Sequence, residues 1–210
     1  MKNFYKDKSL SASSIVLGPI HTNAYILEDI NSKQAVLIDP SVYDSGVVEY
    51  IKKEKLDIIG IINTHGHADH IGGNSSFGYP IFIHEKDKDF LNDISLNLSF
   101  LAGITVKSSP SARLLKDGDT VMIGTSSIEV IHTPGHTPGG ICLKCGNLLF
   151  TGDTLFLESV GRTDCPRGSS QALIKSIKEK LFILPDNTRV LPGHGEFSTI
   201  GHEKKHNPFL

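Results

Sequence analysis

The stretch "INTHGHADHI", residues 62–71, places three histidines and an aspartate within six positions. It follows "DIIGII", residues 57–62, a short apolar run of the kind that forms a buried strand. So many polar side chains crowded together are costly, because they lose their hydrogen bonds to water. A divalent cation removes that cost, since imidazole and carboxylate groups are ordinary ligands for zinc, iron and manganese.

The spacing of this motif favours one shared pocket. His65 and His67 alternate, so in an extended segment their side chains point to the same side. Asp69 and His70 follow where a short helix is expected to begin, and their side chains can face the same space. A solvated histidine-rich turn is the alternative, but the H-x-H-x-D-H spacing behind a buried strand favours the metal site.

Three further residues of ligand type follow apolar strands. His136 lies between two Pro-Gly pairs in "TPGHTPGG", Asp153 ends "LLFTGD", and His194 lies in "PGHG". A stiff strand followed by a tight turn aims such a side chain in a defined direction. If the strand ends share one edge of the fold, these residues converge with the motif at residues 65–70.

The remaining pattern favours an α/β (α+β) protein. Apolar runs bounded by turn residues predict strands within residues 13–29, 34–40, 57–64, 80–84, 112–135, 141–145, 147–153 and 188–195. Periodic stretches predict helices within residues 42–57, 68–77, 85–93, 169–184 and 199–210. Ser169 or Ser170 is the expected N-cap of the fourth helix, and residues 92–110 are expected as a helix or a loop over the site. This order predicts an αββα four-layer sandwich of two mixed β-sheets with helices outside, in a single domain over residues 1–210.

Composition and charge exclude several classes of protein. Hydrophobic residues make up 39% and charged residues 21% of the 210-residue chain, which are values of a globular domain with a full core. The formal net charge of −2 offers no electrostatic surface for nucleic acid or an anionic membrane. No apolar run approaches the ~20 residues that span a bilayer. The N-terminus also lacks a secretory apolar segment, so we expect a cytoplasmic protein.

The three cysteines, Cys142, Cys145 and Cys165, do not suggest a disulfide framework, because their number is odd. Cys142 and Cys145 form a C-x-x-C, but they lie on an expected strand. Side chains three positions apart on a strand point to opposite faces. We therefore expect neither a redox pair nor a zinc pair there.

The ordered set H-x-H-x-D-H, His136, Asp153 and His194 resembles the metallo-β-lactamase-fold hydrolases over nearly the whole chain. The stretches "TGDTLF", "GRTD", "PGHG" and "TIGHEKKHNPF" are similar to the short bacterial glyoxalase II-like (hydroxyacylglutathione hydrolase-like) branch. The resemblance implies two divalent cations ~3.5–4 Å apart. We expect zinc first, with iron or manganese as alternatives.

The resemblance also implies a role for each ligand-type residue. Asp153 would bridge the two cations, and Asp69 would act in catalysis as a ligand of the second cation. One cation would be held by His65, His67 and His136. The other would be held by Asp69, His70 and His194.

The implied chemistry is hydrolysis of a thioester. A water shared by two cations loses its proton near neutral pH and supplies a hydroxide that attacks the carbonyl carbon. A thiolate then leaves without a strong general acid. The implied substrate is S-D-lactoylglutathione or a similar small acyl-thiol.

One departure from the long glyoxalase II enzymes concerns how the thiol is bound. Those enzymes carry a C-terminal helical domain with basic residues for glutathione, and we expect no such domain within residues 1–210. Arg162 in "VGRTD" either binds a substrate carboxylate through its planar guanidinium or pairs with Asp164. Both interpretations stay open at this point.

Alternatives within the same superfamily are a persulfide dioxygenase with a single iron, which also shows "GRTD", and a lactonase. Outside enzymes, a metal-binding regulatory protein is the alternative. We expect no nucleotide, because phosphate-binding glycine loops are absent from the sequence. The oligomeric state is left open.

Supporting residues are expected around the ligands. Asp39 in "VLIDP" is expected to accept a hydrogen bond from a ligand histidine and fix its tautomer. Asn23 and Tyr25 are expected to line the pocket, with a core-filling role for Tyr25 as the alternative. Thr64 is expected to support the ligand loop, and His132 to be a buried supporting histidine.

Overall fold

The first of two large sheets contains seven strands in the computed structural model, which describes residues 1–102 and 104–210. In chain order they are β1 (Lys2–Lys6), β2 (Leu10–Leu17), β3 (Thr22–Asp29), β4 (Gln34–Ile38), β5 (Asp57–Ile62), β6 (Ile81–His84) and β7 (Arg113–Leu115). Strands β1 to β4 pair antiparallel, whereas β4 to β7 pair parallel. The sheet is therefore mixed.

The second sheet is mixed too, with the strand order β15-β14-β11-β10-β9-β8 among the described residues. Its strands are β8 (Thr120–Ile123), β9 (Ser126–His132), β10 (Ile141–Cys145), β11 (Leu148–Gly152), β14 (Arg189–Pro192) and β15 (Ser198–Thr199). Only the pair β11 and β14 is parallel within this described sheet. A short hairpin, β12 (Leu155–Phe156) and β13 (Ser159–Val160), lies beside it.

The main core lies between the two sheets, and strand alternation explains which side chains enter it. Along β3, Tyr25 and Leu27 face the inter-sheet core, while Ile26 packs on the outer face. Along β10, Cys145 faces the inter-sheet core and Cys142 packs outside. The prediction that the two cysteines point to opposite faces is confirmed.

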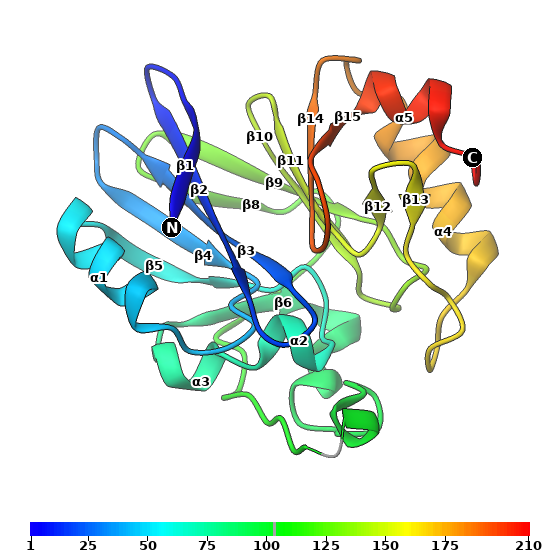
Figure 1. Ribbon diagram of the computed structural model, residues 1–210, viewed down its shortest axis with the longest axis horizontal. Helices are drawn as coiled ribbons and strands as arrows, with labels where there is room; N and C mark the ends of the chain where they lie inside the picture. Colours follow the sequence, from blue (N-terminus) through cyan, green and yellow to red (C-terminus); the bar gives the residue numbers. More distant parts are fainter. Residues whose placement is uncertain (103) are drawn as a thin grey trace.

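Helices cover both outer faces, which confirms the αββα sandwich (Figure 1). Helix α1 (Ser45–Glu54) packs on the first sheet through Val47 and Ile51. Helix α4 (Ser170–Ser176) continues as a π-helix, η3 (Ile177–Leu181), and both pack with α5 (Ile200–His206) on the second sheet. Each apolar side chain buried in this way stabilises the fold by about 1.5–3 kcal/mol.

Two helix predictions were wrong in detail. Residues 68–77 form two helices, α2 (Ala68–Ile71) and α3 (Asn74–Phe77), in place of one. The helix is interrupted at Gly73. Its N–H donates to Pro40 O over 2.7 Å, and a side chain at this position would collide with that oxygen. The polar helix expected at residues 85–93 is a 3₁₀ helix, η1 (Glu85–Leu91).

Other local features either match the expectations or add to them. Ser169 is the N-cap of α4, where it accepts from Ala172 N. Strand β1 was not predicted. Within residues 92–110 one 3₁₀ turn occurs, η2 (Ser99–Ala102), and the expectation for residue 103 lies outside the described residues. Among the described residues, no helix has both the length and the apolar character that crossing a bilayer requires.

Candidate metal centre

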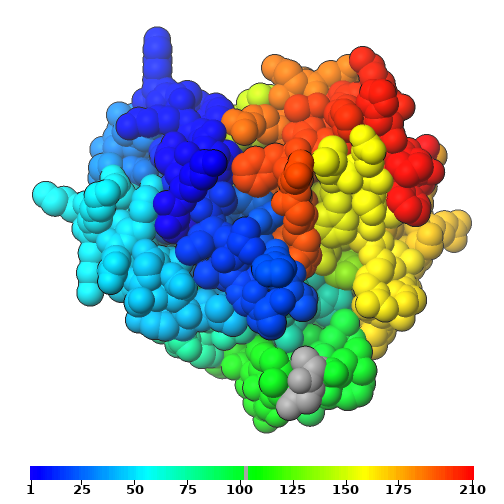
Figure 2. All heavy atoms as spheres, in the orientation of Figure 1, coloured from blue at the N-terminus to red at the C-terminus, as the bar shows by residue number. Residues whose placement is uncertain are grey.

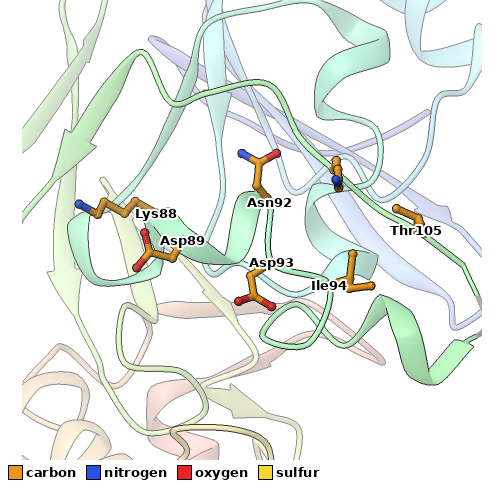
Figure 3. Close-up of a pocket in the computed structure, with 7 residues that line it drawn as sticks. Lys88, Asp89, Asn92, Asp93, Ile94 and Thr105 are labelled. Atoms are coloured by element: carbon orange, nitrogen blue, oxygen red, sulfur yellow. The ribbon is translucent and has the colours of Figure 1, made fainter.

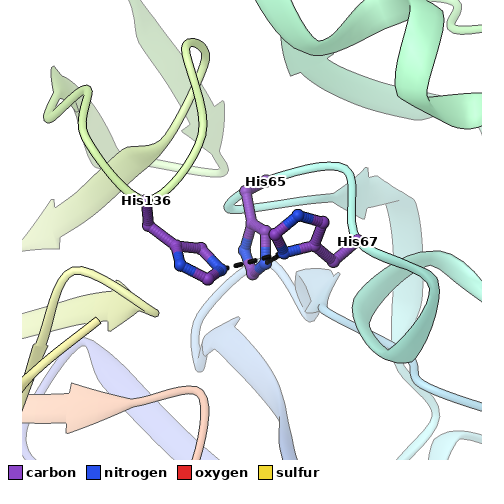
Figure 4. Close-up of side chains that lie close together, drawn as sticks. All are labelled: His65, His67 and His136. Atoms are coloured by element: carbon purple, nitrogen blue, oxygen red, sulfur yellow. Dashed lines mark hydrogen bonds between the residues drawn. The ribbon is translucent and has the colours of Figure 1, made fainter. Parts of the chain in front are cut away.

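Three imidazoles meet where β5 and β9 of different sheets end (Figure 4). His65 Nε2 lies 3.1 Å from His67 Nδ1, which lies 2.9 Å from His136 Nε2. A tetrahedral zinc ion with bonds of 2.0–2.1 Å to nitrogen sets its ligand atoms about 3.3 Å apart. These three residues, the first ligand group, are therefore arranged nearly as a bound cation requires.

A second cluster lies next to it. Asp69 Oδ2 lies 3.1 Å from His70 Nε2 and 3.1 Å from His194 Nε2. Asp69 and His70 come from α2, whereas His194 follows β14 in the other sheet. We call Asp69, His70 and His194 the second ligand group.

Asp153, at the end of β11, lies between the two groups. Its Oδ1 is 3.3 Å from His70 Nε2, and its Oδ2 is 3.6 Å from His136 Nε2 and 3.7 Å from His194 Nε2. A single carboxylate thus faces both ligand groups. Gly193 permits this approach, because a Cβ there would lie 2.6 Å from His70 Cε1.

The donor atoms are better satisfied by a pair of divalent cations than by hydrogen bonds to one another. His70 Nε2 and Asp153 Oδ1 are buried and have no hydrogen-bond partner among the described residues. A buried polar atom without a partner costs about 1–3 kcal/mol. A cation between the imidazole and the carboxylate would satisfy both atoms.

Burial and charge set the protonation of these residues. Burial, together with the neighbouring imidazoles, lowers the pKa of His65 well below its ordinary value and that of His67 to about 3. Both rings are therefore neutral at pH 7, as metal ligation requires. Burial opposes the charged form of His70, but Asp69 and Asp153 raise its pKa well above the ordinary value.

Burial and charge act on the pKa values of the two carboxylates in the opposite directions. Burial acts to raise the pKa of Asp69 and of Asp153, but the charge on His70, the hydrogen bonds to both carboxylates and the other imidazoles together outweigh it and lower both pKa values. The centre therefore combines carboxylates that stay ionised with a positive charge between them. A divalent cation supplies that positive charge in place of a proton.

Asp39 connects His70 of the second ligand group to Thr64, which follows β5. Its Oδ2 accepts a hydrogen bond from His70 Nδ1 over 2.9 Å, which turns His70 Nε2 toward the centre. The same carboxylate accepts from Thr64 N over 2.8 Å and from Thr64 Oγ1 over 2.6 Å. Asp39 and Thr64 thus hold the ligand loop in the way the sequence predicts.

Asn23 and Tyr25 hold the turn that carries His194. Asn23 Nδ2 donates to Pro192 O and to Gly195 O, each over 3.0 Å, and Tyr25 OH donates to Pro192 O over 2.6 Å. Of the two roles left open for Tyr25, the structure shows the core-filling one. Its ring fills the inter-sheet core, because its position on β3 faces inward.

Arg162 pairs with Asp164 and not with the centre. Its Nε and a terminal nitrogen donate to the two oxygens of Asp164 over 2.7 and 2.8 Å, and both side chains are exposed. The backbone of Arg162 does contribute, since its carbonyl accepts from His136 Nδ1 over 2.7 Å. Of the two interpretations left open for the Arg162 side chain, the structure shows the pair with Asp164.

Asp87 supports the loops around the centre, a contact that the sequence did not reveal. Its buried carboxylate accepts from Gly66 N over 3.1 Å, from Thr137 Oγ1 over 2.7 Å and from Gly139 N over 2.6 Å. Gly66 lies between His65 and His67, which follow β5 of the first sheet, and Thr137 and Gly139 follow His136. Asp87 therefore ties together loops from both sheets, and nothing in "EKDKDF" distinguishes it from its charged neighbours.

Histidines outside the centre have other partners. His132 Nε2 donates to Pro138 O over 2.9 Å, so it supports the loop that carries His136. Its ring stacks on that of His84, with centroids 4.0 Å apart. His202 pairs with Glu158 over 2.9 Å on the surface of α5.

Comparison with protein families gives one match over most of the chain. The family model described as the metallo-beta-lactamase superfamily matches residues 17–194. A relative named probable metallo-hydrolase YqgX from Bacillus subtilis is 38% identical in an alignment of 201 positions that covers 92% of this chain and 94% of the relative. A relative named hydroxyacylglutathione hydrolase GloC from Haemophilus influenzae is 35% identical, over 86% of this chain and 89% of the relative.

Solved structures agree with this match. The crystal structure of BLEG-1, named a B3 metallo-beta-lactamase, has a TM-score of 0.89 and 40% identity, over 95% of this chain and 99% of that one. The crystal structure of TTHA1623 in a di-iron-bound form has a TM-score of 0.83 and 34% identity, over 94% of this chain and 100% of that one. The second neighbour holds two metal ions in this fold.

Proposed function

Because the chain belongs to the metallo-beta-lactamase superfamily, as a metal-dependent hydrolase, we propose that it hydrolyses the thioester bond of a small acyl-thiol. The relative named hydroxyacylglutathione hydrolase GloC supports this class of substrate by its name. The motifs "GRTD" and "PGHG", which resemble the short glyoxalase II-like branch, support it as well.

The observation that carries the proposal is the pair of ligand groups that share the carboxylate of Asp153. Each group would hold one divalent cation, zinc or alternatively iron or manganese, with Asp153 between them. Bound there, such a pair of cations supplies a nucleophile from water at neutral pH and neutralises charge that develops on the carbonyl oxygen.

The chain's own residues keep this centre in order and meet the substrate. Asp39 and the backbone of Arg162 fix the ring orientations of His70 and His136. Asp69 belongs to the second ligand group and also lines the adjoining cavity, so it is the ligand residue placed to contact the substrate. A thioester suits the site because a thiol has a pKa of about 8.5 and leaves as a thiolate without a proton from a general acid.

The test is to measure metal content and thioester hydrolysis for three variants and the wild-type protein. Asp69→Ala and His136→Ala each remove a ligand from a different group, so both should lose metal and lose hydrolysis of a panel that includes lactoylglutathione. His206→Ala removes an exposed histidine and is the control. Turnover that stays unchanged in both ligand variants would contradict the proposal.

Two other activities belong in the same assay. Persulfide oxidation by a single iron is the alternative that "GRTD" raises, and oxygen uptake with a persulfide would identify it. Iron content alone does not discriminate, because the TTHA1623 structure is di-iron-bound. The similarity to BLEG-1 adds a β-lactam to the panel, and hydrolysis of the β-lactam in preference to every thioester would contradict the proposal.

A further inference from the structure

A cavity of about 420 Å³ adjoins the second ligand group at Asp69. Its walls come from the turn between β2 and β3, from Ser41 and Val42, and from residues 97–99, 101, 104 and 106. In Figure 2 the segment near residue 100 (green) lies at the lower edge of the molecule, and that turn (blue) lies above it. The cavity is within the size range of small-molecule sites in proteins.

The walls are mainly apolar. The residues with large aliphatic side chains are Ile20, Val42, Leu98, Leu101, Ile104 and Val106. Among the described lining residues Asp69 is the only ionisable one, and no lysine or arginine is present. The carboxylates of glutathione would find no cationic partner here, and burying an unpaired charge is costly.

Another hollow of the molecule shows the contrast. It measures about 660 Å³ and is lined by side chains of both charges (Figure 3), namely Lys88, Asp89, Asn92, Asp93, Ile94, Thr105 and Lys107. None of these residues belongs to a ligand group. The lining of this hollow is therefore mainly charged and polar, whereas large aliphatic side chains dominate the lining of the cavity beside Asp69.

The apolar walls stay open to solvent. Ile20 is 57% exposed, Leu101 70% and Ile104 53%, although all three line the cavity. An apolar group that enters would remove this surface from water, which is favourable by about 25 cal/mol per Å². The wall is also tied to the centre, because Ile20 O accepts from His194 Nδ1 over 3.2 Å.

Ser41, one of the lining residues, carries a polar atom without a partner among the described residues. Ser41 is 2% exposed, and its Oγ makes no hydrogen bond within the described residues. Gly18 passes close above it, so that a Cβ at Gly18 would lie 2.5 Å from Ser41 Oγ. A buried hydroxyl of this kind is satisfied when a ligand supplies a hydrogen-bonding atom.

We propose that this cavity binds the acyl group of the substrate and that this group is an aliphatic chain longer than lactoyl, with Ser41 Oγ hydrogen-bonded to a polar atom of the thioester. The inference rests on the thioesterase function proposed above. The acyl side is assigned to the cavity because the common carrier thiols, glutathione among them, are polar or charged and do not match its walls.

The experiment uses the metal-loaded protein and glutathione thioesters of acetate, butyrate, hexanoate and D-lactate. We expect kcat/KM to rise about fourfold for each added methylene, which corresponds to about 0.8 kcal/mol. Leu101→Asp should lower the ratio of hexanoyl to acetyl kcat/KM at least tenfold. Ile183→Asp is the matched control, because Ile183 is 76% exposed and lies outside the cavity, and it should leave that ratio unchanged.

Ser41→Ala tests the polar contact. It should lower kcat/KM for these thioesters about three- to tenfold, the usual contribution of one hydrogen bond, and should not lower the midpoint of thermal unfolding. A loss of stability with unchanged kcat/KM would assign the hydroxyl a structural role and remove it from the proposal.

Failure of this inference and failure of the proposed function give different results. The inference is wrong if kcat/KM is independent of acyl length or rises with the apolar character of the thiol. The proposed thioesterase function is kept in either case. If no thioester is hydrolysed, the proposed thioesterase function is wrong. Binding of hexanamide and acetamide, measured by calorimetry, then tests whether the cavity binds an aliphatic chain. Tighter binding of hexanamide that Leu101→Asp weakens supports the inference, and equal or absent binding overturns it.

Discussion

Replacing Asp87 by alanine removes a buried carboxylate that links the ligand loops of the two sheets. Two backbone N–H groups, of Gly66 and Gly139, and the hydroxyl of Thr137 lose their acceptor. Hydrogen bonds to a charged group contribute about 1.5–3 kcal/mol each. Burial raises the pKa of Asp87, so part of that gain offsets the cost of burying its charge. We therefore expect Asp87→Ala to lower the free energy of unfolding by a net ~3–5 kcal/mol.

The assay is thermal and urea unfolding of metal-free protein, with Asp89→Ala as the control. Asp89 lies in the same segment but is exposed, so its replacement should change the free energy of unfolding by less than about 0.5 kcal/mol. For a chain of this size, the Asp87 variant should melt about 6–20 °C lower than wild type. If both variants melt like wild type, Asp87 does not link the loops and this account of the site is wrong.

Three further predictions concern other parts of the molecule. Arg162→Ala should change kcat/KM for thioesters less than threefold, because the guanidinium pairs with Asp164 in solvent; a tenfold loss would show that it binds substrate. Burial, and to a smaller extent the nearby His132, lowers the pKa of His84 to about 4. The unfolded chain therefore takes up a proton at higher pH than the folded chain does, and stability falls as pH drops from about 6.5 to about 4. His84→Phe should flatten the plot of melting temperature against pH in that window, and a curve parallel to wild type would refute this. Asp39→Asn should weaken metal binding about 10–100-fold in competition with a chelator, whereas unchanged affinity would exclude its positioning role.

The clustering of these residues of ligand type was predictable because their signals are local. His65 and His67 follow an apolar strand with period-two spacing, and His136 and His194 follow strands that end in Pro-Gly turns. A strand end and a tight turn are specified by a few consecutive residues. The opposite orientation of two side chains three apart on β10 follows from the same geometry.

The supporting contacts were less predictable because they join distant parts of the chain. Asp87 and Gly139 are 52 positions apart, and Asn23 and Pro192 are 169 apart. A charged residue in a polar stretch gives no sign that its side chain is buried between two loops. The break at Gly73 has a similar origin, since it depends on a neighbouring carbonyl that only the folded chain brings close.

Metal content measured on protein loaded with zinc and freed of excess ion tests the central claim most directly. The two ligand groups and the shared carboxylate of Asp153 predict two ions per chain, and Asp153→Ala should reduce that number together with hydrolysis. A folded wild-type protein that retains no ion, or that retains one and keeps full activity when Asp69 is replaced, would contradict the paired site.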